Sequence, residues 1–242
     1  MPLCSALASF VRPIFEFAYP PICFVCEAPL RDGEKKVCGE CWRKIGYVQP
    51  ADELYQEMEA RLRATGHIDS LISSFLFEKE GTLQSLIHEL KYNGMTSIGV
   101  DLGKRLGDRI CSVLDISHVN GMVAVPLHRV KKRERGYNQC EWICEGIHDV
   151  TGLQSRHGLL RRVRYTRSQT RLTVDERREN VSDAFVLDPP KDYLLRDGVF
   201  LIVDDVITTG ATIEACAKVL VEGGAKRTIA CSVALADRSA LP

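Results

Sequence analysis

Apolar residues recur along most of the chain in two patterns, which predict strands and helices in turn. Short continuous apolar runs predict strands at 70–78, 121–127, 184–187, 199–205 and 227–236. Apolar residues at helical spacing predict helices at 81–94, 98–114, 138–150 and 211–225. Strands that are apolar throughout and alternate with helices are typical of a parallel sheet covered on both faces, so we expect an α/β fold.

The predicted helices have clear apolar faces and end signals. One face of the helix at 81–94 carries Leu83, Leu86, Ile87 and Leu90, and an Asn-Gly pair ends it. The helix at 211–225 ends in two glycines, which favour helix termination. We expect residues 67–242 to form one α/β domain.

Residues 1–66 do not follow this alternation and form a separate N-terminal part. The opening stretch is apolar but is broken by Arg12, Pro13 and Glu16, so we expect a short amphipathic helix rather than a cleaved signal peptide. The polar stretch 51–66 predicts a helical connector. No apolar run approaches the roughly 18 residues of a membrane span. We expect a cytoplasmic protein, with peripheral attachment to the inner membrane as the alternative setting.

Four of the ten cysteines form two CxxC pairs. Cys23 with Cys26, and Cys38 with Cys41, flank a loop that contains an Arg-Asp-Gly turn. Two such pairs can place four thiolates around one Zn2+ ion, whose tetrahedral geometry is then complete. Redox-active pairs or disulfides are the alternative, but they suit a reducing compartment less well. We therefore expect a structural zinc module and interpret the other cysteines as small buried hydrophobic residues.

Composition excludes few functions. Of the 242 residues, 45% are hydrophobic and 26% charged, as in an average globular protein. The formal net charge is zero, so no global field attracts nucleic acid or a membrane. An anionic partner would have to be recognised by a local patch.

The stretch 200–212 places two adjacent carboxylates at the end of an apolar strand. Asp204 and Asp205 follow a Phe-Leu-Ile-Val run, and a loop rich in Thr and Gly then leads into a helix. Ligands of open α/β sheets bind beyond the carboxyl ends of strands, and helix N-termini bind phosphate. Ribose 5-phosphate fits, with its hydroxyls at the carboxylates and its phosphate at the loop. The alternative is an ordinary turn in which a Thr caps the helix, which leaves the carboxylates unexplained.

This stretch resembles the phosphoribosyl pyrophosphate (PRPP) loop of type I phosphoribosyltransferases. The resemblance implies the parallel-sheet fold of those enzymes, with Asp204 and Asp205 as the catalytic pair that contacts the ribose hydroxyls. The residues that it implies for the 5-phosphate are Thr208, Thr209, Gly210, Ala211 and Thr212.

Three further stretches narrow the resemblance. Residues 90–94, 125–139 and 165–185 resemble segments of the ComF family of competence proteins, which combine a four-cysteine zinc module with a phosphoribosyltransferase domain. The similarity extends over nearly the whole chain. One departure is Ser-Gln-Thr-Arg at 168–171, where many members have Pro-Gln-Thr-Gly, and it adds a charge to that loop.

Two arginine-rich segments supply the candidate cationic residues. In a phosphoribosyltransferase the first segment would lie against Mg2+-pyrophosphate, and its candidates are Arg129, Arg133 and Arg135. The second resembles the mobile lid of that fold and also suits a nucleic-acid backbone, and its candidates are Arg161, Arg162, Arg164, Arg167 and Arg171. Bases could stack on Tyr137 or Tyr165 nearby. For both segments the alternative is a solvated charged surface.

The resemblance leaves two functions open, and PRPP binding is common to both. The first is a ComF-like protein that binds Mg2+-PRPP and acts in natural competence and DNA uptake, through contacts with single-stranded DNA or a competence helicase. The alternative is an active phosphoribosyltransferase of nucleotide metabolism, which transfers the ribosyl group to a small acceptor and has no role with DNA.

Overall fold

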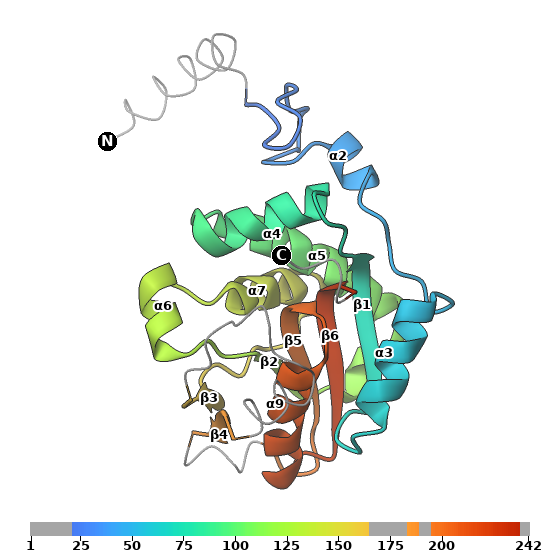
Figure 1. Ribbon diagram of the computed structural model, residues 1–242, viewed down its shortest axis with the longest axis vertical. Helices are drawn as coiled ribbons and strands as arrows, with labels where there is room; N and C mark the ends of the chain where they lie inside the picture. The colour runs from blue at the N-terminus through green and yellow to red at the C-terminus, as the bar shows by residue number, and fades with distance from the viewer. Residues whose placement is uncertain (1–20, 165–182, 189–194, 238–242) are drawn as a thin grey trace. The chain divides into compact units, whose positions relative to one another are not determined.

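A four-stranded parallel sheet forms the centre of the larger part of the molecule (Figure 1). The computed structural model describes residues 21–164, 183–188 and 195–237. The sheet has the strand order β1-β6-β5-β2, and every neighbouring pair is parallel. Its strands are β1 Ser70–Leu76, β2 Gly121–Ala124, β5 Val199–Ile207 and β6 Arg227–Leu235. The expected α/β fold with a parallel sheet is confirmed.

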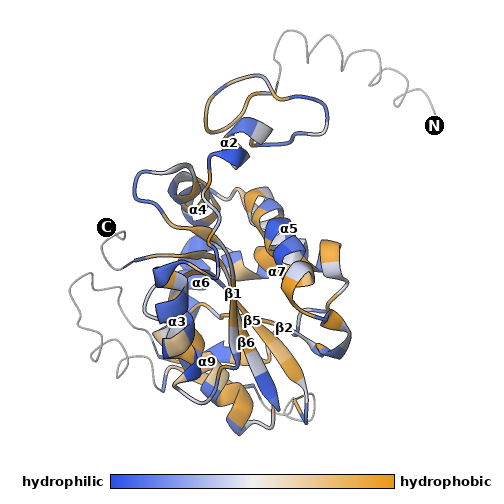
Figure 2. Ribbon diagram, turned by 90° about the vertical axis from the view of Figure 1, so that its right-hand side faces the viewer, coloured by the Kyte–Doolittle hydropathy of each residue, from blue (hydrophilic) through white to orange (hydrophobic). Residues whose placement is uncertain are grey.

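Helices cover both faces of this sheet. On one face α5 (Thr96–Val113) and α7 (Gln139–Thr151) pack together, and α4 (Thr82–Tyr92) packs against α5. On the other, α3 (Glu53–Arg63) packs against β1, and α9 (Ala211–Glu222) packs against β5 and β6. Figure 2 shows α3 and α9 on the opposite side of the sheet from α5 and α7, with hydrophobic residues concentrated in the strands between them.

Several predicted elements agree with the structure, and two differ from it. All four apolar residues of the predicted 81–94 face are buried in α4. The strand expected at 184–187 does not join the parallel sheet: β4 (Phe185–Leu187) pairs antiparallel with β3 (Leu160–Arg162) in a separate two-stranded sheet. The basic stretch after β2 forms a short helix, α6 (Arg129–Arg135), which the apolar pattern did not predict. A single 3-10 turn, η1 (Ile116–His118), precedes β2.

Glycines set the separation of α5 and α7. A Cβ atom at Gly103 would lie 2.1 Å from the Ile143 carbonyl oxygen, and one at Gly146 would lie 2.1 Å from the Val100 carbonyl oxygen. Backbone thus contacts backbone where the two helices cross, and no larger side chain fits there. This contact allows α5 and α7 to pack closely side by side on the same face of the sheet.

The chain divides into two compact units, Met1–Gly46 and Tyr47–Pro242. This division falls earlier than the boundary that we expected after residue 66. The reason is that α3 lies in the hydrophobic core of the larger unit, where its residues Tyr55, Met58 and Leu62 are buried. The stretch interpreted as a connector is therefore part of the fold that surrounds the sheet.

Candidate functional site

The two carboxylates lie inside β5 rather than beyond its end. The strand continues through Val206 to Ile207, so the expectation that it ends at Asp205 was wrong. The backbone fixes both side chains, because the Asp205 N–H donates to Asp204 Oδ1 at 2.9 Å and the Val206 N–H donates to Asp205 Oδ1 at 2.8 Å. Both carboxylates are therefore held in place near the carboxyl end of the central strand.

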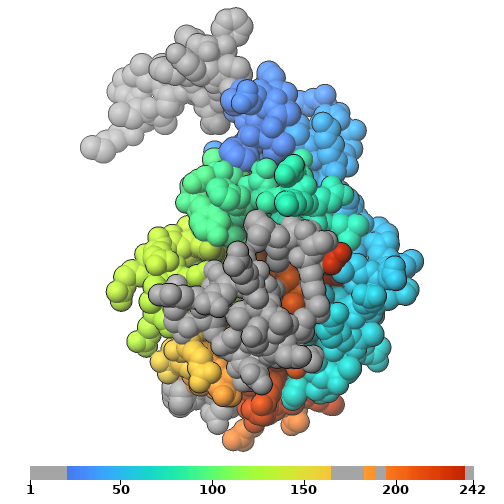
Figure 3. All heavy atoms as spheres, in the orientation of Figure 1, coloured from blue at the N-terminus to red at the C-terminus, as the bar shows by residue number. Residues whose placement is uncertain are grey.

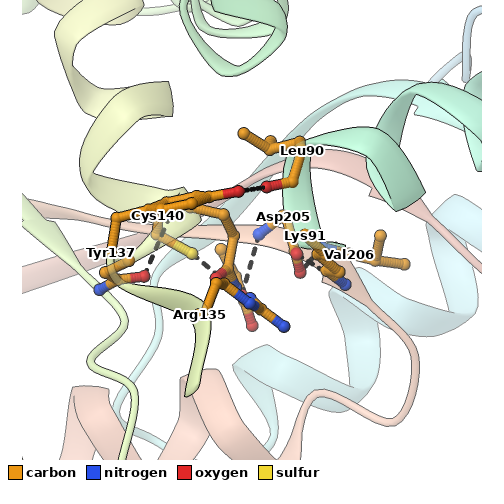
Figure 4. A network of polar contacts seen from close by, with 10 residues as sticks. Leu90, Lys91, Arg135, Tyr137, Cys140, Asp205 and Val206 are labelled. Atoms are coloured by element: carbon orange, nitrogen blue, oxygen red, sulfur yellow. Dashed lines mark hydrogen bonds and ion pairs between the residues drawn. The ribbon is translucent and has the colours of Figure 1, made fainter. Parts of the chain in front are cut away.

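A lysine from α4 neutralises this pair from within the protein. Lys91 Nζ lies 2.6 Å from Asp205 Oδ2, and the two side chains point toward each other (Figure 4). Asp205 is only 5% exposed. Burial alone would lower the pKa of Lys91, but the Asp205 and Asp204 carboxylates outweigh it and raise that pKa, so the lysine stays charged.

Sequence analysis missed Lys91, although one signal pointed to it. Lys91 follows Ile87 by four residues in α4, so it lies on the buried side of the helix, next to a run of apolar positions. A charged residue that continues a buried face needs a partner of opposite charge. The sequence offered the paired aspartates of β5 but no means of bringing the two elements together.

Asp204 is a carboxyl group whose pKa is raised above the ordinary value of an aspartate. Burial and the Asp205 carboxylate raise the pKa of Asp204 to about 7, although Lys91 opposes the shift. Cys140 Sγ, at the start of α7, lies 3.5 Å from Asp204 Oδ1 and donates to it. Burial and the Asp204 charge raise the pKa of the Cys140 thiol, which therefore keeps its proton. Carboxyl groups that titrate near neutral pH are concentrated at functional sites.

The loop at 208–210 leads directly into α9. Gly210 caps this helix with a left-handed φ of 79°, and a Cβ there would lie 2.7 Å from Leu62 Cδ2 on α3. Glycine is thus required by packing on α3 as well as by backbone conformation. The Thr209 hydroxyl accepts a 3.4 Å hydrogen bond from the Ala211 N–H. A helix N-terminus leaves its first N–H groups without intrahelical partners, and residues 208–212 lie at this end of α9.

One further cation, Arg162, interacts with Asp204, and Lys131 lies near Arg162. Arg162 in β3 lies over the Phe185 ring, with Cζ 5.3 Å from the ring centroid. Burial lowers the pKa of Arg162, against the opposing effects of Cys216 and Asp204. Lys131 in α6 is half-buried, and burial together with Arg135 and Arg162 lowers its pKa. Arg162 from β3 thus adds positive charge near Asp204, and Lys131 from α6 adds charge near Arg162 and Lys91.

One pocket brings the two predicted arginine segments together. It has a volume of about 400 Å³ and lies beyond the carboxyl end of β2. Its basic side chains come from both segments and from the turn between α7 and β3: Arg129, Lys132, Arg156, Arg161 and Arg162. The sequence suggested two separate sites, whereas the fold makes one cationic cavity from them.

The other candidate arginines have different places. Arg135 lies over the ring of Tyr92 on α4, with Cζ 5.5 Å from the ring centroid. Arg133 and Arg164 are exposed on the surface. Arg167 and Arg171 fall outside the residues that the structure describes.

The four expected cysteines converge in the smaller unit. The sulfur atoms of Cys23, Cys26, Cys38 and Cys41 all lie within 4.8 Å of one another. A tetrahedral zinc with ligands at about 2.3 Å places its sulfurs about 3.8 Å apart, and Cys26 Sγ and Cys38 Sγ are 3.7 Å apart. The Cys38 N–H donates to Cys23 Sγ at 3.3 Å, and such backbone bonds overcome the effect of burial and lower the pKa of Cys23 to about 6. The cluster is compatible with a structural zinc site.

Among the helices in the described part of the chain, none is long and apolar enough to cross a membrane.

Comparison with known proteins relates the chain to proteins of DNA utilization. No family model matches it. The DNA utilization protein YhgH of Escherichia coli (strain K12) is 27% identical over 220 residues, which cover 85% of this chain and 93% of that protein. Competence protein F of Haemophilus influenzae is 33% identical over 99 residues, which cover 41% of this chain and 43% of that protein. The chain is homologous to these proteins. This relationship confirms the resemblance to competence proteins that the sequence motifs indicated.

A solved structure of the allosteric regulatory enzyme of purine biosynthesis overlaps part of the chain. The overlap has a TM-score of 0.39 and 19% sequence identity, and it covers 60% of this chain and 29% of that chain. The chain spans less than a third of that enzyme, and nothing about its activity is carried over.

Proposed function

We propose that the protein binds Mg2+-PRPP at the Asp204–Asp205 pair and acts in DNA utilization. The observation that carries this proposal is the geometry of β5. Its two carboxylates lie next to the short loop that starts α9, with Lys91 paired to Asp205 and Arg162 in electrostatic interaction with Asp204. PRPP matches these groups in turn. Its ribose hydroxyls face the carboxylates, its 5-phosphate faces the N–H donors at the start of α9, and its pyrophosphate faces the cations.

The ribose and its 5-phosphate would occupy the carboxylates and the α9 N-terminus, respectively. Asp204 titrates near neutral pH, so its carboxyl group can accept or donate a hydrogen bond to a ribose hydroxyl. Asp205 is already paired with Lys91. In this proposal it supports the site, and Asp204 makes the main contact with the ribose hydroxyls. The loop residues 208–212 would bind the 5-phosphate through backbone N–H groups and threonine hydroxyls.

The pyrophosphate end of PRPP needs positive charge. Arg162 interacts electrostatically with Asp204, and Lys131 interacts with Arg162 and Lys91, so both join the expected Arg129, Arg133 and Arg135 as candidates for this end of the ligand. Mg2+ accepts carboxylate oxygens and phosphate oxygens as ligands, and Asp204 is a suitable oxygen donor. When bound, the ion would offset the pyrophosphate charge.

The DNA role is supported by the relatives. Several proteins homologous over most of this chain are named DNA utilization proteins. Cationic residues at the 400 Å³ pocket suit a phosphate backbone. The expected zinc at the four cysteines would stabilise the smaller unit, which is too short to fold around a hydrophobic core alone. A competence helicase and single-stranded DNA remain the predicted partners.

Calorimetric titration with Mg2+-PRPP tests the ligand site. We expect Asp204→Asn to abolish detectable binding while leaving the Lys91–Asp205 pair intact. Asp69→Asn is the matched control, because Asp69 pairs with Arg227 at the opposite, amino ends of the strands. Unchanged PRPP affinity in Asp204→Asn would refute the site. Pyrophosphate release in the same mixture, with and without single-stranded DNA, separates a PRPP-binding protein from an active transferase.

A further inference from the structure

An exposed tyrosine stands beside the basic helix α6. Tyr92 is the last residue of α4, and 67% of its surface is exposed. Its ring centroid lies 4.9 Å from that of His88, and the Arg135 guanidinium lies 5.5 Å from it. Tyr92 has these two neighbours, but most of its ring remains open to solvent. It can therefore present ring surface to a partner.

The local structure fixes this aromatic group in place. The Tyr137 hydroxyl donates to the Leu90 carbonyl oxygen (Figure 4), which ties the turn after α6 to the last turn of α4. Arg135 also donates to Gln139 Oε1, so its guanidinium is held between α7 and Tyr92. Tyr137, one of the two tyrosines on which bases could stack, makes this contact, and Tyr165 lies outside the residues that the structure describes. Tyr92 is more exposed than Tyr137.

Positive charge continues from Tyr92 along α6. The helix has five basic residues and one acidic residue in its seven positions, and it is about 10 Å long. Arg133 and Arg129 are exposed along it, and Arg129 also lines the 400 Å³ cationic pocket at its other end. Figure 3 shows α4 and α6, in green and yellow-green, reaching the surface on the same face of the molecule.

We propose that Tyr92, Arg135 and the outer side of α6 form a binding track for single-stranded nucleic acid, with a base stacked on Tyr92 and the phosphates following α6 to the cationic pocket. This inference rests on the DNA role in the proposed function and names the surface that performs it. Single-stranded nucleic acid is the occupant because it combines aromatic bases with regularly spaced negative charges. A duplex hides the faces of its bases, and the acidic side chains of a protein segment carry no ring that could stack on Tyr92.

Binding of a fluorescein-labelled oligothymidylate, followed by anisotropy, tests the track. We expect Tyr92→Ala to weaken binding by on the order of tenfold, and Tyr92→Phe to stay within about twofold of the wild type, because stacking needs the ring and not the hydroxyl. Tyr47→Ala is the matched control, since Tyr47 is a 50% exposed tyrosine stacked on Phe75, outside the track. We expect it to bind like the wild type.

Salt dependence separates stacking from charge. Arg133→Ala is expected to reduce the slope of log affinity against log salt by about 0.7, the value for one phosphate contact on a single strand. Tyr92→Ala should leave that slope unchanged. An abasic oligonucleotide of the same length should bind the wild type about as weakly as the oligothymidylate binds Tyr92→Ala.

Three results would overturn the track. They are wild-type affinity in Tyr92→Ala, equal affinity of the wild type for abasic and normal strands, and displacement of the oligonucleotide by a poly-glutamate peptide as effectively as by unlabelled strand. A wild-type protein that binds no single strand refutes the track and leaves only a DNA role that acts through a protein partner. PRPP titration of the same samples then shows separately whether the ligand site stands.

Discussion

The ion pair between Lys91 and Asp205 should be the most sensitive polar contact of the larger unit. At 2.6 Å, and with an effective dielectric constant of about 20, the gross attraction is about 6 kcal/mol. Desolvation offsets part of this, and removing one partner of a buried pair typically costs about 3–5 kcal/mol. Because the Lys91 side chain keeps 25% of its surface exposed, we expect Lys91→Met to lower the free energy of unfolding by about 3 kcal/mol, the lower end of that range.

The cost arises from an uncompensated carboxylate, so removing that charge should recover it. We expect Lys91→Met combined with Asp205→Asn to regain most of the lost stability. The single variant should also lose less at pH 5 than at pH 8, because Asp204, whose pKa is raised to about 7, is protonated at pH 5 and then does not repel Asp205. Urea unfolding followed by circular dichroism measures both effects.

A surface pair provides the control. Lys104 and Asp149 lie 3.0 Å apart, but their side chains are 40% and 47% exposed. Lys104→Met should therefore change stability by no more than about 0.5 kcal/mol. The reasoning fails if Lys91→Met costs no more than this control, or if the double variant is as unstable as the single one.

Three further predictions concern the site, the fold and the metal. Between about pH 4 and pH 7 the folded protein holds a proton on Asp204 that the unfolded chain has lost, so the free energy of unfolding should fall as pH rises through this window. In thermal melts, Asp204→Asn should therefore be more stable than the wild type at pH 8 but not at pH 4. Gly103→Ala should lower the free energy of unfolding in urea by about 2 kcal/mol or more, although alanine has the better helix propensity, because its Cβ meets backbone. Gly107→Ala should lower it clearly less, because its Cβ would lie 3.0 Å from the Val150 side chain. Reduced protein should contain about one equivalent of zinc by elemental analysis, and Cys26→Ser should lower this zinc content without changing PRPP affinity. A zinc-free wild-type protein with normal structure would contradict the zinc assignment.

Local pattern was enough to predict most of the fold and part of the site. Periodicity found α4, α5, α7 and α9 and the four strands of the parallel sheet, because each buries an apolar face whose spacing is visible in the sequence. The four cysteines were also recognisable, since two CxxC turns bring their thiolates together by local geometry and one loop. The paired aspartates and the loop at 208–212 are contiguous, so their chemistry could be interpreted without knowing the rest of the chain.

What the sequence could not give are contacts between distant segments. Lys91 meets Asp205 across more than a hundred residues, and only the packing of α4 near the carboxyl end of β5 decides that pairing. Similarly, Arg129 and Arg162 appeared as two separate clusters, but the turn after α7 returns β3 to the end of β2 and makes one pocket of them. The assignment of α3 to the larger unit also depended on tertiary packing, since its polar sequence shows few buried positions.

The sequence by itself determined the chemistry that is available, and tertiary structure decided how it is arranged. Motifs such as the β5 carboxylates specify donors, acceptors and metal ligands because these are properties of side chains and short loops. Other features depend on distances between elements, which are set only when the sheet and helices share one core. They are the pairing of Lys91 with Asp205, the exposure of Tyr92 and the close crossing of α5 and α7 at Gly103. Solvation and pairing of a charge are set by that core, so the titration of Asp204 could be learned only from the folded protein.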